Sequence, residues 1–260
     1  FFFYQNLTKP INFKIKPDAI IHCAAKHGFS KTGNSMKIVY STNLKITKKL
    51  IKFSNKSKVK KLIFLSSIDI YGKINTKEVN ENNKSINSNL YGKSKLISER
   101  LFCQKKNYFK TICLRIPGIF TFDLLKDHPL ILTIIKKTIK NENIKIYNLN
   151  AKFNNVLDSS EIVRMIKIFL NRKKVKSDYY NFAASKPLKF INVIKLIKKI
   201  LNSKSKIIIQ KKDKKSFTIS NRKISREFNF KVATTVKIIT RCCKEIVNNR
   251  YNNKFNFNTK

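Results

Sequence analysis

The sequence predicts an α/β fold in which short buried strands and amphipathic helices alternate around a parallel sheet. Three apolar runs read as strands and end in small, polar or turn-forming residues, at Ala19–Cys23, Lys61–Ser67 and Thr111–Ile116. Between them, apolar residues recur at helical spacing over Thr42–Ser54 and Asn89–Gln104. Alternation of this kind is typical of β–α–β units, so we expect the three strands to pair in parallel.

The same alternation continues more loosely after Ile116. No internal repeat and no low-complexity linker marks a boundary there. We expect three helices, three strands and then two C-terminal helical stretches, with the helices over Pro129–Lys140, Ser159–Asn171 and Phe190–Leu201 and the strands over Lys145–Leu149, Tyr179–Ala184 and Lys206–Gln210.

The charge of the chain is strongly positive, with 57 Lys and Arg against 14 Asp and Glu and a formal net charge of +43. Such a balance is typical of nucleic-acid-binding proteins, which are one alternative here. The lysines, however, recur along nearly every segment and form no arm or stripe. Abundant Lys, Asn, Ile and Phe with few Gly and Pro fit a strongly AT-biased genome. We therefore expect no specific nucleic-acid partner, although the surface would attract anionic substrates.

The five cysteines contain no CxxC pair and share no metal-ligand spacing with the three histidines. We therefore expect a reduced, cytoplasmic protein with no metal site. No apolar run approaches the ~20 residues that a membrane-spanning helix needs, so we expect no membrane partner. The chain opens on Phe1 without a methionine and enters strand-like sequence at once, which suggests that its beginning is missing.

A tyrosine and a lysine stand four residues apart in the segment Tyr91–Lys95. On a helix, both side chains share one face. A lysine ammonium beside a phenol favours the phenolate, so we expect the pKa of Tyr91 to fall below its usual ~10. Such a tyrosine can act as a general base near neutral pH. In so lysine-rich a chain the motif alone is weak, and an ordinary surface helix is the alternative.

A serine at the end of the preceding predicted strand strengthens this interpretation. Ser67 lies 24 residues before Tyr91. Ligands of open α/β sheets bind at the carboxyl ends of the strands, where a serine can donate to a substrate oxygen while Tyr91 takes its proton. We expect the hydroxyls of Ser67 and Tyr91 to face one cleft, with the Lys95 ammonium beneath them.

Taken together, the ordered segments resemble the extended short-chain dehydrogenase/reductase family, and specifically its NAD-dependent epimerase/dehydratase branch, which acts on nucleotide sugars. The resemblance covers essentially the whole chain. It implies a Rossmann-like doubly wound parallel sheet, with residues 1–116 as a partial dinucleotide-binding domain. Residues 117–260 would hold late Rossmann elements and a smaller C-terminal substrate lobe. Besides the Ser67 and Tyr91 motifs, the segments that carry the resemblance are Asp18–Ala25, Thr42-Asn43, Leu114–Phe120, Asn155–Asp158 and Tyr180–Ser185.

The resemblance also implies a site. Its catalytic residues are Ser67, Tyr91 and Lys95, with Lys95 on the nicotinamide ribose and Asn43 bracing Lys95. The cofactor is NAD, with NADP not excluded, and the substrate is a nucleoside-diphosphate sugar that contacts Ser67, Ile68, Asp69 and Gly118. The resemblance further implies a possible homodimer with the helix that carries Tyr91 at its interface. The implied cofactor contacts are Asn6, Leu7, Cys23, Ala24, Ala25, Asn43, Leu65, Tyr91, Lys95 and Pro117.

Two features depart from the family pattern. The family's opening strand and GxxGxxG turn, which seats the pyrophosphate, have no counterpart, because no glycine precedes Gly28. This implies that the first βαβ unit lies upstream of Phe1, and it leaves a catalytically silent or truncated remnant as an alternative. Ile68 and Asp69 stand where dehydratases of the branch carry an acid pair or a glutamate. This favours an epimerase or a simple reductase, with Asp69 either a lone base or a loop-facing charge.

Overall fold

The computed structural model describes residues 4–11, 16–27, 33–120, 130–210 and 216–251. Two compact units divide the chain, and each is described by itself. The first comprises residues 1–74, 80–116 and 165–181, and the second comprises residues 75–79, 117–164 and 182–260. Among the described helices, none combines the length and the apolar character needed to cross a membrane.

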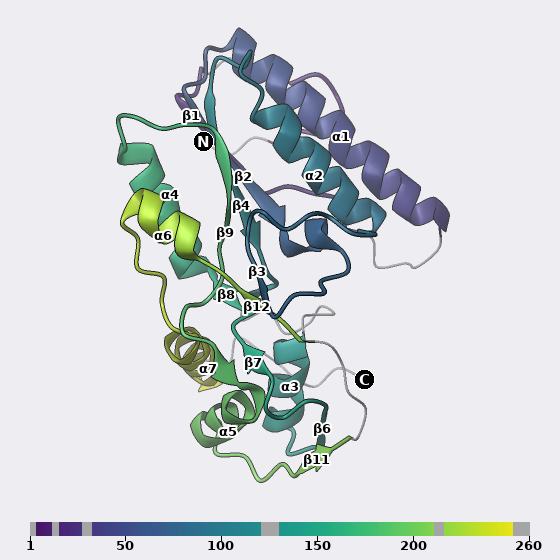
Figure 1. Ribbon diagram of the computed structural model, residues 1–260, viewed down its shortest axis with the longest axis vertical. Coiled ribbons are helices and arrows are strands. Elements are labelled where there is room, and N and C mark those ends of the chain that lie inside the picture. The colour runs from purple at the N-terminus through teal and green to yellow at the C-terminus, as the bar shows by residue number, and fades with distance from the viewer. Residues whose placement is uncertain (1–3, 12–15, 28–32, 121–129, 211–215, 252–260) are drawn as a thin grey trace. The chain divides into compact units, whose positions relative to one another are not determined.

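The first unit contains a four-stranded sheet in which all neighbours pair in parallel, in the order β1-β2-β4-β9 (Figure 1). The predicted parallel α/β fold is therefore confirmed. Buried β2 and β4 form the centre of the sheet, because their runs of apolar side chains are covered on both faces. The strand bounds are Ala19–His22 for β1, Lys61–Ser67 for β2, Lys110–Ile116 for β4 and Asp178–Asn181 for β9.

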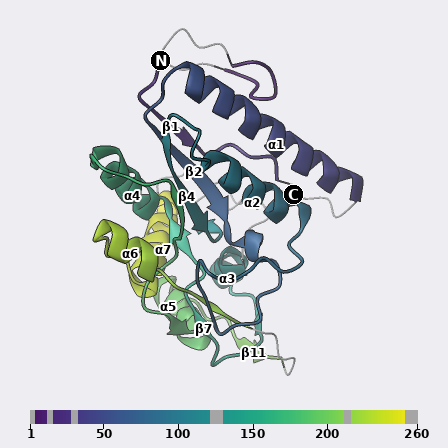
Figure 2. The ribbon, with the colours of Figure 1, turned by 45° about the horizontal axis from the view of Figure 1, so that its top comes forward.

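Two helices, α1 (Gly33–Lys56) and α2 (Leu90–Phe102), lie side by side along one face of this sheet, as both ribbon views show (Figures 1 and 2). Their apolar faces share a core with Leu62 and Phe64 of β2. Helix α1 begins well before the predicted Thr42, because Val39 continues its buried face toward the N-terminus. Helix α2 begins where predicted, since the Asn89 side chain accepts a hydrogen bond from the Gly92 amide and caps it.

The C-terminal half of α4 (Ser159–Asn171) lies on the opposite face of the sheet. The Lys61 ammonium, at the start of β2, donates to the carbonyl oxygens of Phe169 at 3.1 Å and Arg172 at 2.8 Å, and also to that of Leu170. All three ammonium protons thus satisfy carbonyls that the end of a helix leaves without partners.

A short 3₁₀ helix, η1 (Ile68–Tyr71), follows β2 and was not predicted. Ser67 caps it, because the serine Oγ accepts the Asp69 amide at 3.1 Å. The helix ends at Gly72, whose φ is 62°. A Cβ at this position would lie 2.1 Å from the Ile86 carbonyl oxygen, so only glycine fits here.

The second unit is built from helices and short strand pairs. Helix α5 (Phe190–Ile200) packs against α3 (Leu130–Ile139) and α7 (Thr235–Tyr251), and α6 spans Arg222–Phe228. Three of its strand pairs are parallel: β5 (Ile119–Phe120) with β8 (Leu157–Asp158), β6 (Ile144–Ile146) with β11 (Ile207–Ile209), and β3 (Glu78–Val79) with β12 (Thr218–Ile219). A fourth pair, β7 (Lys152–Phe153) with β10 (Leu188–Lys189), is antiparallel.

His22, the last residue of β1, is a core residue whose titration should control stability in acid. Its ring stacks on Phe64 at 5.4 Å, and burial, reinforced by the positive charge of Lys95, lowers its pKa to about 4. An unfolded chain would bind that proton near pH ~6.5. Between these two pH values the unfolded state holds more protons, so protonation favours unfolding as the pH falls.

We therefore expect the free energy of unfolding to drop by as much as about 3 kcal/mol between pH ~6.5 and ~4 through His22. His22→Phe keeps an aromatic ring in the core and removes the titration. In urea unfolding at a series of pH values, the free energy of unfolding should fall less steeply below pH ~6.5 for this variant than for the wild type. The same fall in both proteins would contradict the role of His22 in the pH dependence.

Candidate active site

The carboxyl ends of β1 and β2 and the first turns of α2 hold most of the predicted site residues. Cys23, Ala24 and Ala25 follow β1 directly and are exposed. Ser67 ends β2, and Tyr91 and Lys95 lie one turn apart on α2. All of these residues belong to the first unit. Pro117 and Gly118, also predicted to line the site, follow β4 and belong to the second unit.

Lys95 is a buried ammonium with unused hydrogen-bonding capacity. It is 4% exposed, and its Nζ donates to the Leu65 carbonyl oxygen at 2.7 Å and lies 4.6 Å from the centre of the Phe64 ring. Burial lowers the pKa of Lys95 to about 8, so the group is still mostly protonated at neutral pH. An ammonium has three N–H donors, and two of them find no acceptor among the described residues.

Tyr91 does not have the lowered pKa that the motif predicted. Burial raises the pKa of Tyr91 to about 12, and the negative charge of Asp69 adds to the rise. The Lys95 Nζ lies 5.7 Å from the centre of the Tyr91 ring and is hydrogen-bonded to Leu65 instead. The prediction was wrong because burial and the Asp69 carboxylate both raise the pKa of Tyr91, and a four-residue spacing reveals neither of them.

The Ser67 segment lies directly against the start of α2. A Cβ on Gly92 would come within 2.3 Å of the Asp69 carbonyl oxygen, so the close approach of α2 to η1 requires glycine at this position. The Ser67 Oγ accepts the Asp69 amide at 3.1 Å, and the Ser67 hydroxyl also hydrogen-bonds the Asp69 carboxyl, which lowers the pKa of that carboxyl against the larger, opposite effect of burial. Ser67 therefore lies near the first turn of the helix that carries Tyr91, with Asp69 as the partner of its hydroxyl.

Asn43 of α1 connects the segment after β1 with α2. Its Nδ2 donates to the Lys26 carbonyl and to the Ser94 Oγ, both at 3.1 Å, and its Oδ1 accepts the Lys26 amide at 2.8 Å. Asn43 thus fixes α2 through Ser94, and its Oδ1 accepts the Lys26 amide while the Lys95 ammonium donates to the Leu65 carbonyl. Asn43 and Lys95 both line a void of about 10 Å³, which is close to the smallest volume that holds a water molecule.

The N-terminal pair Asn6 and Leu7 has local and core contacts. The Asn6 Oδ1 accepts hydrogen bonds from the amide and the hydroxyl of Thr8, at 2.9 and 2.7 Å. Leu7 packs against the core shared by α1, α2 and β2. No hydrogen bond or ring contact among the described residues joins either of them to Tyr91 or Lys95.

Two further residues are neighbours of the site. The His27 ring packs edge-on against the Tyr91 ring, with the centroids 4.7 Å apart. Glu99, one turn beyond Lys95, forms a buried ion pair with Arg115 of β4 at 2.8 Å. A signal for the second was available, because an arginine within an apolar strand needs a buried partner.

Comparison with known proteins places the chain in a family. Residues 4–183 match the NAD dependent epimerase/dehydratase family. A UDP-glucose 4-epimerase of Halalkalibacterium halodurans is 34% identical over 103 residues, which are 38% of this chain. That match spans only 30% of the epimerase's own length.

Solved structures show the same fold. RMD from Pseudomonas aeruginosa complexed with NADPH has a TM-score of 0.76 and 17% identity, covering 94% of this chain and 88% of that one. A UDP-glucose 4-epimerase of Thermotoga maritima with UDP-glucose has a TM-score of 0.75 and 16% identity, covering 91% and 79%. These similarities confirm the fold, including its Rossmann-like parallel sheet. At identities of 16% and 17% they show the fold alone.

Proposed function

The chain belongs to the NAD-dependent epimerase/dehydratase family, and from this we propose that it transforms a nucleotide sugar by hydride transfer, with Tyr91 as the proton-transfer group. The observation that carries the proposal is the arrangement of three side chains. Tyr91 and Lys95 share one face of α2, and Gly92 holds that helix against the segment that follows Ser67. The catalytic residues are then Ser67, Tyr91 and Lys95.

The residues around Lys95 fit a nicotinamide nucleotide. Its two unengaged N–H donors suit the hydroxyls of a ribose, and Ala24 and Ala25, which are exposed after β1, place no large side chain beside the segment that a ribose would approach. Cys23, Leu65 and Asn43 would complete this part of the cofactor site, with NAD as the first choice and NADP as the second. When bound, the nicotinamide ring supplies the hydride acceptor and donor.

The chain's own part in the reaction is to hold and move a proton. With substrate bound, the Ser67 hydroxyl donates to a sugar oxygen in place of Asp69 and so orients that oxygen, and Tyr91 exchanges a proton with the same oxygen. Because the pKa of Tyr91 is about 12 here, its phenolate needs stabilisation in the reaction, and we assign that role to the Lys95 ammonium, 5.7 Å from the ring centre. Ile68 has no proton to give, which favours epimerisation or simple reduction over a dehydration that needs two acids.

The second unit offers a place for the nucleotide part of the substrate, in keeping with the role of substrate lobe that we assign to residues 117–260. A cavity of about 320 Å³ lies wholly within this unit. Lysine ammoniums in its wall can pair with a diphosphate, and aromatic rings can pack against a base. The residues of this kind are Lys145, Lys152, Tyr147, Phe153, Phe190 and Phe217.

The proposal is tested by incubating the purified protein with NAD and either UDP-glucose or UDP-N-acetylglucosamine and identifying the products by NMR. We expect the 4-epimer of one of these sugars to form. Release of reduced nicotinamide without an epimer would favour a dehydrogenase instead. If neither sugar nucleotide is converted and NAD does not bind, the protein is a catalytically silent member of the family.

Lys95→Met should impair both chemistry and cofactor binding. The change removes a ribose contact and the cation that stabilises the Tyr91 phenolate. We expect turnover to fall at least about 10²-fold and NAD affinity to fall about 10- to 100-fold, the value of a hydrogen bond to a charged group. Calorimetry and product analysis measure the two effects separately. Lys93→Met, on the exposed side of the same helix, is the matched control and should change neither.

A further inference from the structure

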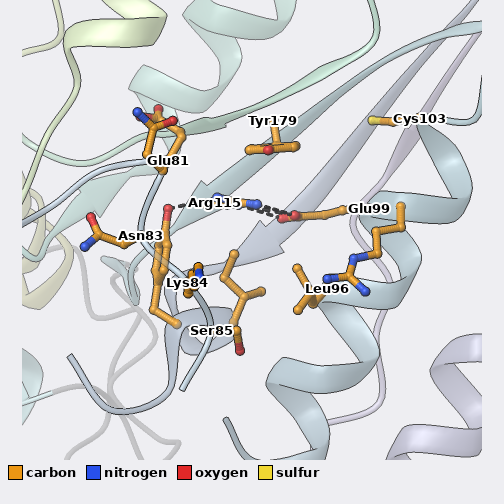
Figure 3. Close-up of a pocket in the computed structure, with 13 residues that line it drawn as sticks. Glu81, Asn83, Lys84, Ser85, Leu96, Glu99, Cys103, Arg115 and Tyr179 are labelled. Atoms are coloured by element: carbon orange, nitrogen blue, oxygen red, sulfur yellow. Dashed lines mark hydrogen bonds and ion pairs between the residues drawn. The ribbon is translucent and has the colours of Figure 1, made fainter. Parts of the chain in front are cut away.

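A second cavity in the first unit lies apart from the proposed catalytic residues. Its volume is about 540 Å³, and residues of α2, η1, the loop after β3, β4 and β9 line it (Figure 3). Ser67, Tyr91 and Lys95 are not among the residues that line it. The side chains that bear on its chemistry are Lys84, Glu99, Arg100, Cys103, Arg115 and Tyr179.

Arg115 is buried in the wall of this cavity with part of its guanidinium unengaged. It is 4% exposed, its Nε and Nη2 donate to the Glu99 carboxylate, and its Nη1 donates to the Tyr71 hydroxyl at 2.9 Å. Tyr179 covers the guanidinium at 3.9 Å from its ring centre (Figure 3). A guanidinium has five N–H groups, so two of them, one on each Nη, find no acceptor in the described part of the chain.

The remaining charges of the wall favour an anion. Arg100 and Lys84 are exposed and form no ion pair with any described residue. Both acidic side chains of the wall already accept hydrogen bonds, Glu99 from Arg115 and Glu81 from the Asn181 amide at 2.7 Å. The amide groups of Asn82 and Asn83 add further donors nearby.

We propose that this cavity binds a small molecule carrying a phosphate group, with the phosphate against Arg100 and Arg115. Guanidinium groups recognise phosphate through paired N–H donors, and the tetrahedral anion accepts from more directions than a planar carboxylate does. The volume lies within the usual range of about 300–1,000 Å³ for small-molecule sites. This site is independent of the function proposed above.

Cys103 provides a local reporter of occupancy. Cys103 lines the cavity and is half-buried, whereas Cys23 is exposed after β1, outside the cavity and in the cofactor site proposed above, so its alkylation in the same sample reports any binding at that other site. Alkylation of each cysteine by iodoacetamide is followed by peptide mass spectrometry. At a concentration ten times the Kd of the added compound, we expect inorganic phosphate or ribose 5-phosphate to slow the alkylation of Cys103 about tenfold. The alkylation rate of Cys23 should not change.

Variants and competing ions separate the proposal from a general salt effect. The double variant Arg100→Gln, Lys84→Gln changes exposed residues only and should abolish the protection, whereas Lys106→Gln, outside the cavity, should preserve it. Protection by ribose 5-phosphate identifies a phosphate ester as the ligand class, and protection by inorganic phosphate alone identifies the free ion. Three results would each overturn the proposal. They are no protection of Cys103 by either phosphate compound, equal protection by malonate or chloride at the same ionic strength, and full protection in the double variant.

Discussion

Tyr91→Phe is expected to lower the turnover of the nucleotide sugar by about 10²–10⁴-fold, the usual contribution of general acid–base catalysis. The variant keeps the aromatic ring that packs against His27 and loses only the hydroxyl. Cofactor affinity should change little, because Lys95 and its hydrogen bond to Leu65 remain. Single-turnover measurement of nicotinamide absorbance after mixing with substrate is the decisive experiment, since it reports the hydride step without product release.

The control for this experiment is Tyr108→Phe, which removes the same hydroxyl from an exposed tyrosine. Its single-turnover rate should equal that of the wild type. An unchanged rate in Tyr91→Phe would remove Tyr91 from the mechanism, and with it the main reason for assigning hydride-transfer chemistry to this chain. Equal melting temperatures of the three proteins would show that any loss of rate is chemical in origin.

The central elements of the fold could be predicted because their sequences carry strong local signals. β2, β4 and α4 have uninterrupted apolar runs or helical periodicity, and their bounds match the prediction to within a residue. The two-residue strands of the second unit, such as β5 and β8, escaped prediction. Strands this short are defined by their pairing partners, and no local pattern of residues marks them.

The candidate site was located from the sequence, but its electrostatics were not. The spacing of Tyr91 and Lys95 places them on one helix face, as expected. The direction of the Tyr91 pKa shift depends on burial and on Asp69, which approaches only because Gly92 allows α2 to lie on η1. Tertiary contacts of this kind cannot be derived from spacing, and the catalytic roles of these residues stay predictions until the variants are measured.

The ion pair of Glu99 and Arg115 carries the other large expected effect, on stability. The side chains are 1% and 5% exposed, respectively, and the pair also holds Tyr71, whose hydroxyl donates to the Asn181 Oδ1 at 2.7 Å. The network thereby connects α2, β4, η1 and β9. Loss of one partner leaves the other charge buried and uncompensated, which typically costs about 3–5 kcal/mol.

We therefore expect Glu99→Gln to destabilise the first unit by about 3–5 kcal/mol, whereas the double variant Glu99→Leu, Arg115→Met should recover much of the loss, because it leaves no buried charge. Hydrogen exchange of peptides from β2 and β4 measures the stability of this unit, and peptides from α5 monitor the second unit in the same sample. Asp18→Asn, which breaks the exposed pair with Lys60, is the matched control and should change exchange in β2 and β4 very little.

Equal exchange rates in Glu99→Gln and the wild type would show that the Arg115 guanidinium does not need its carboxylate partner. A double variant no more stable than Glu99→Gln would show that the network's hydrogen bonds to Tyr71, rather than the buried charge, account for the loss.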